Sequence, residues 1–573
     1  MRKGSKIQTF DHNNKDEPSR HDIVRSSSSW WKFPSWESKK NLTRSSAIEN
    51  GINVNFINVR EQQKKSKATT DCAVDSSLVS LSSAAANTKA HDLYKAIKTG
   101  SLEEMQNLLT LHYNNRNNRN EINSADKENS FTFMHYAARY NRSDAIRCLI
   151  DVGADVNRKG GKDFITPLHV AAQFNCPNAA QTLIQFDATI SQNSKTKENP
   201  LHYCCKYGNE KVAEVILREA ERLNMTGKIV NQPDSESHCP IHLAALYNNK
   251  KMIDILLTYA ASIVRKDVNG QLPSHFAAEH KDTAILEHLL QYAKMKGHND
   301  YVIISNNEGG TALHIAADVG SVVAAEVCFK YGAEIEAQNH ELLTPLHIAA
   351  VNGNCEFAEY LISKGAKVNS KDNDGRTSLH YAALSNNISL TELLIHQGAD
   401  IEARDNRGQT PLLLAVINGY TPVIKKLLEL GADIATTDSN GRHCMHYLAE
   451  KSDVSTILAV LKNGGKELVN QPDNEGIIPS HIAAMKGTIT TLYQLYENGT
   501  SLDTVDEEGN TLLHIAAKGN HRDTVKLILQ ATKAKDINIR NAFGQKPIHI
   551  AAKYGHNRVV HNMIRNGADI NSK

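Results

Sequence analysis

The sequence is poor in aromatic residues and has no long apolar run. Phe, Trp and Tyr make up 6% of its 573 residues, which is low for one large enzyme core but ordinary for stacked helices rich in Ala and Leu. No stretch reaches the roughly 18 consecutive apolar residues of a membrane-spanning helix. The basic amino terminus continues into polar residues without an apolar core, which disfavours a secretory signal. We therefore expect neither a transmembrane span nor secretion.

An excess of charge of one sign is also missing. The 65 Lys and Arg residues nearly balance the 63 Asp and Glu residues, which leaves a net charge of +2. This balance argues against a nucleic-acid-binding protein and against recruitment to membranes by charge alone. The nine cysteines are an odd number without a disulfide-framework spacing, so a reducing, cytoplasmic setting is expected.

Motifs of common catalytic sites are absent. The chain contains no Walker loop, no G-x-G-x-x-G and no G-x-S-x-G. His340, Glu341 and His347 lack the spacing that would place two zinc ligands on one helical face. We expect no enzymatic activity, no catalytic residues and no cofactor.

Residues 1–90 differ in composition from the rest, because they are rich in Ser and in Lys or Arg and contain long polar runs. This composition predicts a disordered tail. All three tryptophans lie here, at Trp30, Trp31 and Trp36. They are consistent with a short docking motif, with insertion into a membrane interface, or with residual clustering in a flexible tail, and the sequence leaves these alternatives open.

One phrase, close to T-P-L-H-x-A, recurs thirteen times, usually at 33-residue steps. Its fourth position, called here the histidine slot, is Leu413 in one copy and histidine in the other twelve. The slot histidines are His135, His169, His202, His242, His275, His314, His347, His380, His446, His481, His514 and His549.

This period and this phrase are typical of ankyrin repeats, and the chain is identified as a member of that family. The assignment implies an all-α solenoid of about 13–14 helix-turn-helix repeats with β-turn fingers. We expect a weak first repeat at 91–130, with Tyr94 in the histidine slot, and clear repeats over 131–573. The last copy resembles an interior repeat rather than a polar cap, which predicts an array cut at a repeat boundary.

The repeat that starts at Thr344 shows how one unit is expected to fold. Thr344 is placed to cap the first helix, and Pro345 occupies its first turn. Gly353 and Gly365 are expected to end the two helices. Residues 372–375 then predict the turn of a finger. Equivalent finger tips are expected at 267–270, 306–309, 405–408, 438–441, 473–476 and 506–509.

The slot histidines are interpreted as structural, each hydrogen-bonding backbone between adjacent fingers. A zinc site is the alternative for one local cluster of suitable residue types: His202, Cys204, Cys205, Cys239 and His242. Its two histidines are slot residues, and Cys204 and Cys205 replace the usual Ala-Ala pair. We therefore expect no metal.

Three cysteines lie next to or near a basic residue, which can stabilise a reactive thiolate. They are Cys148, Cys205 and Cys328. The alternative is that they are small buried apolar residues of the repeat helices.

Two repeats carry insertions, around 219–231 and around 292–302. Insertions in a solenoid map to loops on one face, so these two loops and the finger tips are the predicted contact sites.

A second resemblance rests on the stretch from 272 to 335, which includes Leu272-Pro273-Ser274-His275, the second insertion and the pair Asn306-Asn307. It is similar to the cytoplasmic amino-terminal array of transient receptor potential ankyrin-type cation channels. That resemblance implies a place on the cytoplasmic face of the plasma membrane, joined to the membrane part of a channel tetramer. No pore residue of that family has a counterpart in this sequence.

Two functions remain open at this stage. The chain is either the sensing and docking arm of such a channel or a complete soluble scaffold. In both cases we expect protein partners, bound through the finger tips and the concave face, and no nucleic acid.

Overall fold

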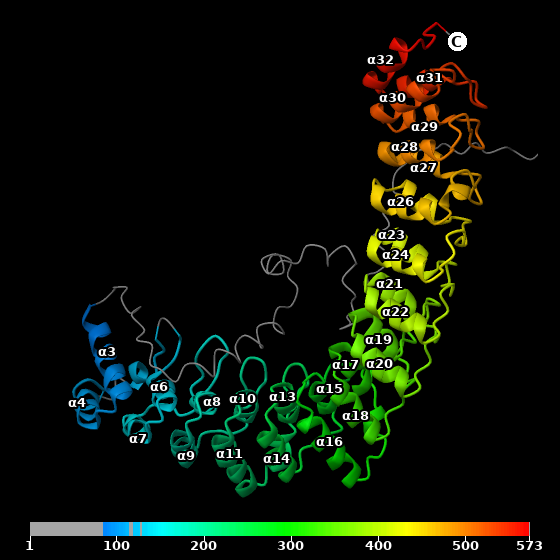
Figure 1. The fold of residues 1–573 in the computed structure, drawn as a ribbon. Coiled ribbons are helices and arrows are strands. Elements are labelled where there is room, and N and C mark those ends of the chain that lie inside the picture. Colours follow the sequence, from blue (N-terminus) through cyan, green and yellow to red (C-terminus); the bar gives the residue numbers. More distant parts are fainter. Residues whose placement is uncertain (1–83, 114–118, 127–128, 572–573) are drawn as a thin grey trace, which may run out of the picture. The chain divides into compact units, whose positions relative to one another are not determined.

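The computed structural model describes residues 84–113, 119–126 and 129–571. Contacts divide the chain into two units, Met1–Ala84 and Ala85–Lys573, and the second unit holds the repeats (Figure 1). The predicted tail and its tryptophans, Trp30, Trp31 and Trp36, lie outside the described residues. The first described helix, α3, begins at Ala84.

Thirteen helix pairs follow one another along the described array, and an earlier pair, α3 (Ala84–Thr99) and α4 (Leu102–Tyr113), precedes them. The first helices of the thirteen pairs are α6 (Phe133–Arg139), α8 (Pro167–Gln173), α10 (Pro200–Tyr207), α13 (Pro240–Leu246), α15 (Pro273–Ala278), α17 (Ala312–Val319), α19 (Pro345–Asn352), α21 (Ser378–Leu384), α23 (Pro411–Asn418), α25 (Cys444–Ala449), α27 (Pro479–Lys486), α29 (Leu512–Lys518) and α31 (Pro547–Lys553).

The second helices are α7 (Ser143–Asp151), α9 (Pro177–Gln185), α11 (Glu210–Arg222), α14 (Lys250–Thr258), α16 (Ala284–Met295), α18 (Val322–Lys330), α20 (Cys355–Ser363), α22 (Ile388–His396), α24 (Thr421–Glu429), α26 (Val454–Lys462), α28 (Ile489–Glu497), α30 (Arg522–Ala531) and α32 (Asn557–Arg565). Short elements between the pairs are α5 (Arg119–Ile122), α12 (Thr226–Val230), η3 (Tyr301–Ile303) and η4 (Gly465–Leu468).

Each first helix packs against the first helix of the next repeat, and each second helix against the next second helix. Figure 1 shows the pairs following one another in chain order. The described residues form no β-strand, only the isolated bridges Gly160–Ile165 and Val505–Thr511. The prediction of an all-α solenoid of 13–14 repeats is confirmed.

Small residues let the paired helices approach closely. In α19, Ala349 and Ala350 are completely buried against the neighbouring helices. Pro345 occupies the first position of the helix, where its missing N–H costs no intrahelical bond. Gly353 ends α19 with φ +72°, a left-handed conformation that favours glycine. Alanine packing of this kind explains how a chain with few aromatic residues builds a continuous core.

The fingers are Asp-capped turns that are tied to one another. Asp372 Oδ1 accepts hydrogen bonds from the backbone N–H groups of Asp374 (2.9 Å) and Arg376 (2.8 Å). The backbone N–H of Asn373 donates to the carbonyl of Glu341 in the preceding finger, at 3.0 Å. Asn406 donates to Asp374 in the same way, at 2.8 Å. Successive fingers therefore form a hydrogen-bonded row beside the helices.

Two glycines of this repeat have left-handed backbones, but only one of them lies against the next repeat. Replacing each with alanine therefore separates the cost of backbone strain from the cost of disturbing the contact between repeats. Alanine at Gly365 (φ +98°) would meet open space, so Gly365→Ala should cost only left-handed strain, about 1 kcal/mol. A Cβ at Gly353 would lie 2.7 Å from Asn387 Nδ2. Asn387 donates to the Gly353 carbonyl (3.1 Å) and caps α22 by accepting from Leu390 N–H (2.9 Å).

Gly353→Ala should therefore cost about 1 kcal/mol more than Gly365→Ala, because it also disturbs an N-cap. Hydrogen exchange followed by mass spectrometry should show faster amide exchange in α22 for Gly353→Ala only. Equal exchange of α22 in both variants would contradict this role of Asn387.

Candidate functional site

The slot histidines bridge two repeats. In the repeat of α19, His347 Nδ1 accepts from the backbone N–H of Thr344 at 3.1 Å, and Nε2 donates to the carbonyl of Ser370 at 2.9 Å. Nε2 therefore carries the proton. Nε2 has the same kind of backbone partner in the next repeat for ten slot histidines: His135, His169, His202, His242, His275, His314, His347, His380, His446 and His514.

The Nδ1 contact is a helix cap that sequence reasoning missed. The spacing Thr-x-x-His matches the capping box, with the ring in place of the usual Glu or Gln. His481 and His549 keep this bond, accepting from Ile478 and Lys546 at 3.4 Å and 3.2 Å. In the repeat without a slot histidine, Thr410 Oγ1 accepts instead from the Leu413 N–H at 3.3 Å.

Burial keeps the rings of His135, His202 and His314 neutral. Removal from water lowers the pKa of His135, His202 and His314 to about 4, from an ordinary value near 6.5. A neutral ring bonded at both nitrogens has no lone pair for a metal or a substrate. The ten slot histidines bonded in this way thus hold adjacent repeats in register.

His238 differs from the slot histidines, and the sequence analysis overlooked it. It is buried between two fingers, with Nδ1 3.3 Å from Asp234 Oδ2 and Nε2 3.5 Å from Asp267 Oδ2. Burial works against its charge, but the hydrogen bond to Asp234 and the negative charges of both carboxylates prevail and raise its pKa to about 9. A charged histidine therefore clamps these fingers together. The available signal was an Asp four residues before a histidine at the base of a finger.

The zinc-compatible cluster does not form a site. His202 and His242 use Nε2 to bond the backbone carbonyls of His238 and Arg265, at 3.1 Å and 3.0 Å. Within the part of the chain that the structure describes, no group of three or more His, Cys, Asp or Glu side chains is arranged to hold a metal ion.

Two of the three candidate cysteines are in the core. Cys205 and Cys328 are fully buried, and burial raises the pKa of both thiols, that of Cys328 to about 12. Such thiols stay protonated and inaccessible. Cys148 is half-buried, and its thiol pKa is also raised, mainly by burial. The neighbouring basic residues therefore do not create thiolates.

The two insertions brace the array. The first lengthens α11 and forms α12, whose Ile229 and Val230 are buried. The second forms the end of α16 and η3, where buried Tyr301 donates its hydroxyl to the Ile263 carbonyl at 2.9 Å. A hollow of about 210 Å³ opens beside it, lined in part by Lys294 and His298.

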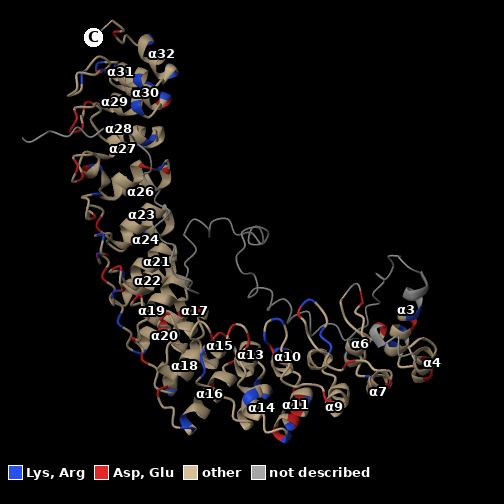
Figure 2. Ribbon diagram, turned by 180° about the vertical axis from the view of Figure 1, so that it is seen from behind, with Lys and Arg blue, Asp and Glu red and all other residues tan. Residues whose placement is uncertain are grey.

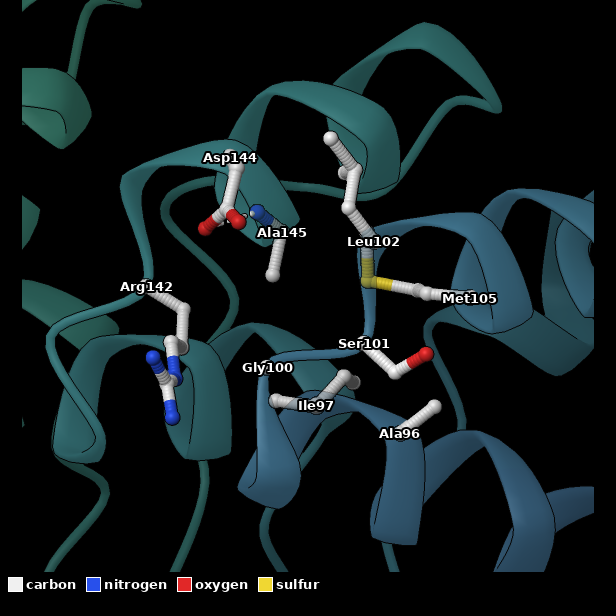
Figure 3. Close-up of a pocket in the computed structure, with 9 residues that line it drawn as sticks. All are labelled: Ala96, Ile97, Gly100, Ser101, Leu102, Met105, Arg142, Asp144 and Ala145. Atoms are coloured by element: carbon white, nitrogen blue, oxygen red, sulfur yellow. Dashed lines mark hydrogen bonds between the residues drawn. The ribbon is translucent and has the colours of Figure 1, made fainter.

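A crevice between the first two repeats is a packing seam. Figure 3 shows Arg142 reaching toward the turn between α3 and α4, beside Gly100 and Ile97. Its guanidinium donates to the Lys98 carbonyl at 3.2 Å, and the space inside is too small for a water molecule. The crevice is therefore not a ligand site.

Four aromatic residues occupy the same position in four consecutive repeats. We call Tyr140, Phe174, Tyr207 and Tyr247 the aromatic ladder; each is the fifth residue after a slot histidine and lies at the end of α6, α8, α10 or α13. Phe174 is 42% and Tyr207 46% exposed, and the other two are half-buried. Exposed aromatic residues in a row are typical of an interaction surface.

The residues before the first two rings each contact the next ring. The Arg139 guanidinium lies 4.7 Å from the Phe174 ring centroid and 6.0 Å from that of Tyr140. Gln173 Nε2 donates to the Tyr207 hydroxyl at 3.3 Å.

Lys206 precedes Tyr207 in the same way. Burial disfavours its charge, but interactions with Tyr247, Glu198 and other neighbours raise its pKa overall. Side chains of the scaffold therefore contact both Phe174 and Tyr207, the two most exposed rings of the ladder. The signal of the ladder in the sequence was the recurring aromatic residue five positions after the slot.

Comparison with known families agrees with this architecture. Models of ankyrin repeats (3 copies) match residues 161–227, 241–339, 274–372, 327–405, 379–471 and 480–573, and a model of ankyrin repeats (many copies) matches 134–184. These segments cover well over half of the sequence. The chain belongs to the ankyrin-repeat family.

Curated ankyrin-repeat relatives include channels and other proteins. The chain is 29% identical over 119 residues to a "Transient receptor potential cation channel subfamily A member 1 homolog" of Caenorhabditis elegans, covering 21% of this chain and 10% of the relative. It is 32% identical over 104 residues to the Homo sapiens subfamily A member 1 channel, covering 18% and 9%. It is 27% identical over 138 residues to "Ankyrin repeat-containing protein ITN1" of Arabidopsis thaliana, covering 23% and 20%.

The matched segments thus span a tenth to a fifth of these relatives' length. None of the helices described here is both long and apolar enough to cross a membrane.

The two kinds of buried histidine predict opposite pH dependences. Slot rings such as His135 and His202, with pKa values lowered to about 4, stabilise the fold above pH 6.5 and lose that contribution as the pH falls toward 4. His238, with its pKa raised to about 9, contributes fully below pH 6.5 and loses its contribution as the pH rises through 9. The thermal midpoint of His238→Gln should therefore fall furthest below that of the wild type between pH 5 and 6.5.

The difference between His238→Gln and the wild type should shrink toward zero by pH 10, as followed by circular dichroism. His288→Gln is the matched control, because His288 pairs with Asp254 (2.8 Å) at the surface. It should show a much smaller difference at every pH. A His238→Gln difference that does not change with pH would exclude the charged clamp.

Proposed function

We propose that the array is a non-enzymatic, cytoplasmic protein-binding module whose docking surface is the face formed by the first helices and the finger tips. The aromatic ladder is the observation that carries this proposal. Tyr and Arg are enriched among the residues that dominate binding energy at protein interfaces, and here both occur on one exposed edge. The eight described cysteines are free thiols, which agrees with a reducing compartment.

The remaining surface is consistent with binding of proteins rather than catalysis. Figure 2 shows acidic and basic residues interspersed along the array. Neighbouring helices pair opposite charges, as Lys251 of α14 and Glu210 of α11 do at 3.5 Å. The described histidines of the slots are committed to backbone bonds. Ladder and fingers are therefore the surfaces left for recognition.

A photo-crosslinking amino acid tests this function. Replacing Phe174 with p-benzoylphenylalanine keeps an aromatic ring at a 42% exposed position of the ladder. In cells of the source organism, irradiation should give a discrete protein adduct. Adding Tyr207→Ala should remove the adduct, because the partner would lose its second anchor.

The same analogue at Tyr493, which is 45% exposed on α28, is the matched control and should give no such adduct. Identical adducts at both positions, or an adduct insensitive to Tyr207→Ala, would refute docking on the ladder.

A second candidate function is the cytoplasmic arm of a transient receptor potential ankyrin-type channel. Its support is the extended repeat at 272–314 together with the two channel relatives. In that repeat, the finger with the asparagine pair is tied to the preceding one, since Asn307 N–H donates to the Asn269 carbonyl at 2.9 Å. In this role the array would lie at the cytoplasmic face of the plasma membrane, joined to the membrane part of a channel tetramer.

Reading the native transcript beyond the codon for Lys573 tests the channel role. Continuation into several apolar stretches of about 20 residues is expected for a channel arm. A stop codon at that point in every transcript would contradict it and leave the scaffold function.

A further inference from the structure

We propose that the aromatic ladder binds a partner segment in the polyproline II conformation, with proline or another apolar residue at every third position and acidic residues between them. This inference rests on the proposed protein-binding function and specifies the ligand of its docking edge.

The spacing of the rings favours this conformation. The ladder residues lie at equivalent positions of first helices that pack directly against one another. Packed helices are about 8–10 Å apart. A polyproline II helix advances about 9 Å in its three-residue turn, so residues i, i+3, i+6 and i+9 on one face meet successive rings.

Other regular conformations fit the row less well. An α-helix advances about 5.4 Å per turn, so its turns fall out of step with the rings. In a β-strand, side chains three residues apart point to opposite faces. A polyproline II segment is also largely ordered before binding, which reduces the entropy lost on a surface as flat as this edge.

Side chains of the protein already occupy the space between rings of the ladder, which disfavours nucleic acid as the ligand because bases could not stack there. Arg139 occupies the space between Tyr140 and Phe174, and Gln173 connects to Tyr207. A base cannot insert between rings that are bridged in this way, although single-stranded nucleic acids depend on such stacking. Prolyl rings need no insertion, because they pack on the exposed ring surfaces.

Polar groups on the edge suit the backbone of the ligand. Carbonyl groups of a polyproline II segment have no internal hydrogen bonds and seek donors. The Tyr207 hydroxyl accepts from Gln173, so its own hydrogen can point outward to a carbonyl of the ligand.

Basic side chains beside the rings are the reason why we expect acidic residues in the ligand. Arg139 and Lys206 lie beside the rings, and Lys250 is exposed one residue after the turn that follows Tyr247. These three side chains form no direct salt bridge among the described residues, and Glu198 and Asp163 act on Lys206 only from a longer distance. Carboxylates placed between the apolar positions of the ligand would meet these cations.

The ladder also has a definite length. In the next repeat the equivalent position is His280, whose Nε2 lies 3.0 Å from the Ala245 carbonyl of the preceding repeat. The following repeats have Val319, Asn352 and Ser385 there. Four rings at one turn each accommodate a segment of about twelve residues.

Fluorescence anisotropy with the full chain tests the inference. The probe is a fluorescein-labelled peptide in which Pro-Glu-Pro is repeated four times. The comparison peptide repeats Gly-Glu-Ser four times, with equal length and charge but no preference for polyproline II. We expect the proline peptide to bind at least ten-fold more tightly at physiological salt.

Two double variants locate the binding site. Phe174→Ala with Tyr207→Ala should weaken binding of the proline peptide at least ten-fold. Tyr493→Ala with Tyr496→Ala removes two similarly exposed rings of α28 and should leave binding unchanged. Circular dichroism checks that both variants are folded, which exposed positions should allow.

Three outcomes overturn the inference. Equal affinity for the two peptides would mean that charge alone binds. Tighter binding of a twelve-residue oligouridylate would assign the ladder to nucleic acid. Absence of peptide binding, with the Phe174 photo-adduct still formed and still dependent on Tyr207, would refute the polyproline II ligand while leaving the protein-binding function intact.

Discussion

The slot histidine is the contact on which the architecture depends. One neutral ring closes the amino terminus of its own first helix and holds the finger of the next repeat, as His347 does through Thr344 and Ser370. Both bonds lie in surroundings where an unpaired polar group costs about 1–3 kcal/mol. Each repeat therefore has one preferred position against its neighbour. Leu413 shows that one such contact is dispensable, because the finger bond from Ser439 to Arg407 (2.9 Å) persists beside it.

The fixed stacking of the repeats brings residues at the same repeat position together on one surface. Because ten of the slots are held in the same way, the residue five positions later lies at an equivalent place in successive repeats. Aromatic residues 33 to 40 positions apart in the chain, such as Tyr207 and Tyr247, thereby become neighbours on one edge. The linking side chains Arg139 and Gln173 then order the rings before any partner arrives. Neutrality of the slot histidines is part of this arrangement, since a charged ring could not accept the capping bond.

Local signals in the sequence were sufficient for most of the fold. Pro345, Gly353 and the finger at 372–375 lie where their conformational preferences predict, because each preference acts within a few residues. Features that join two repeats were missed. His238 is charged because Asp267 of the next finger faces it, and no local pattern shows that partner. Local neighbours in the sequence were also a poor guide for Cys328. A lysine two residues away suggested a reactive thiol, whereas the helix places the thiol in the core.

In the proposed function, a protein partner is recognised by surface side chains that take no part in stacking the repeats. At the carboxyl-terminal end of the array, the last residues of α27, α29 and α31 are the exposed lysines Lys486, Lys518 and Lys553. Five residues after the slot histidine, the same repeats have Lys486, Gly519 and Tyr554 instead of an unbroken row of rings, although caps, fingers and core are alike in both parts. Substitutions at these positions change what the edge can bind without changing how the repeats stack. Under the proposed function, binding specificity is separable from stability, and it resides in the side chains along this edge rather than in the residues that stack the repeats.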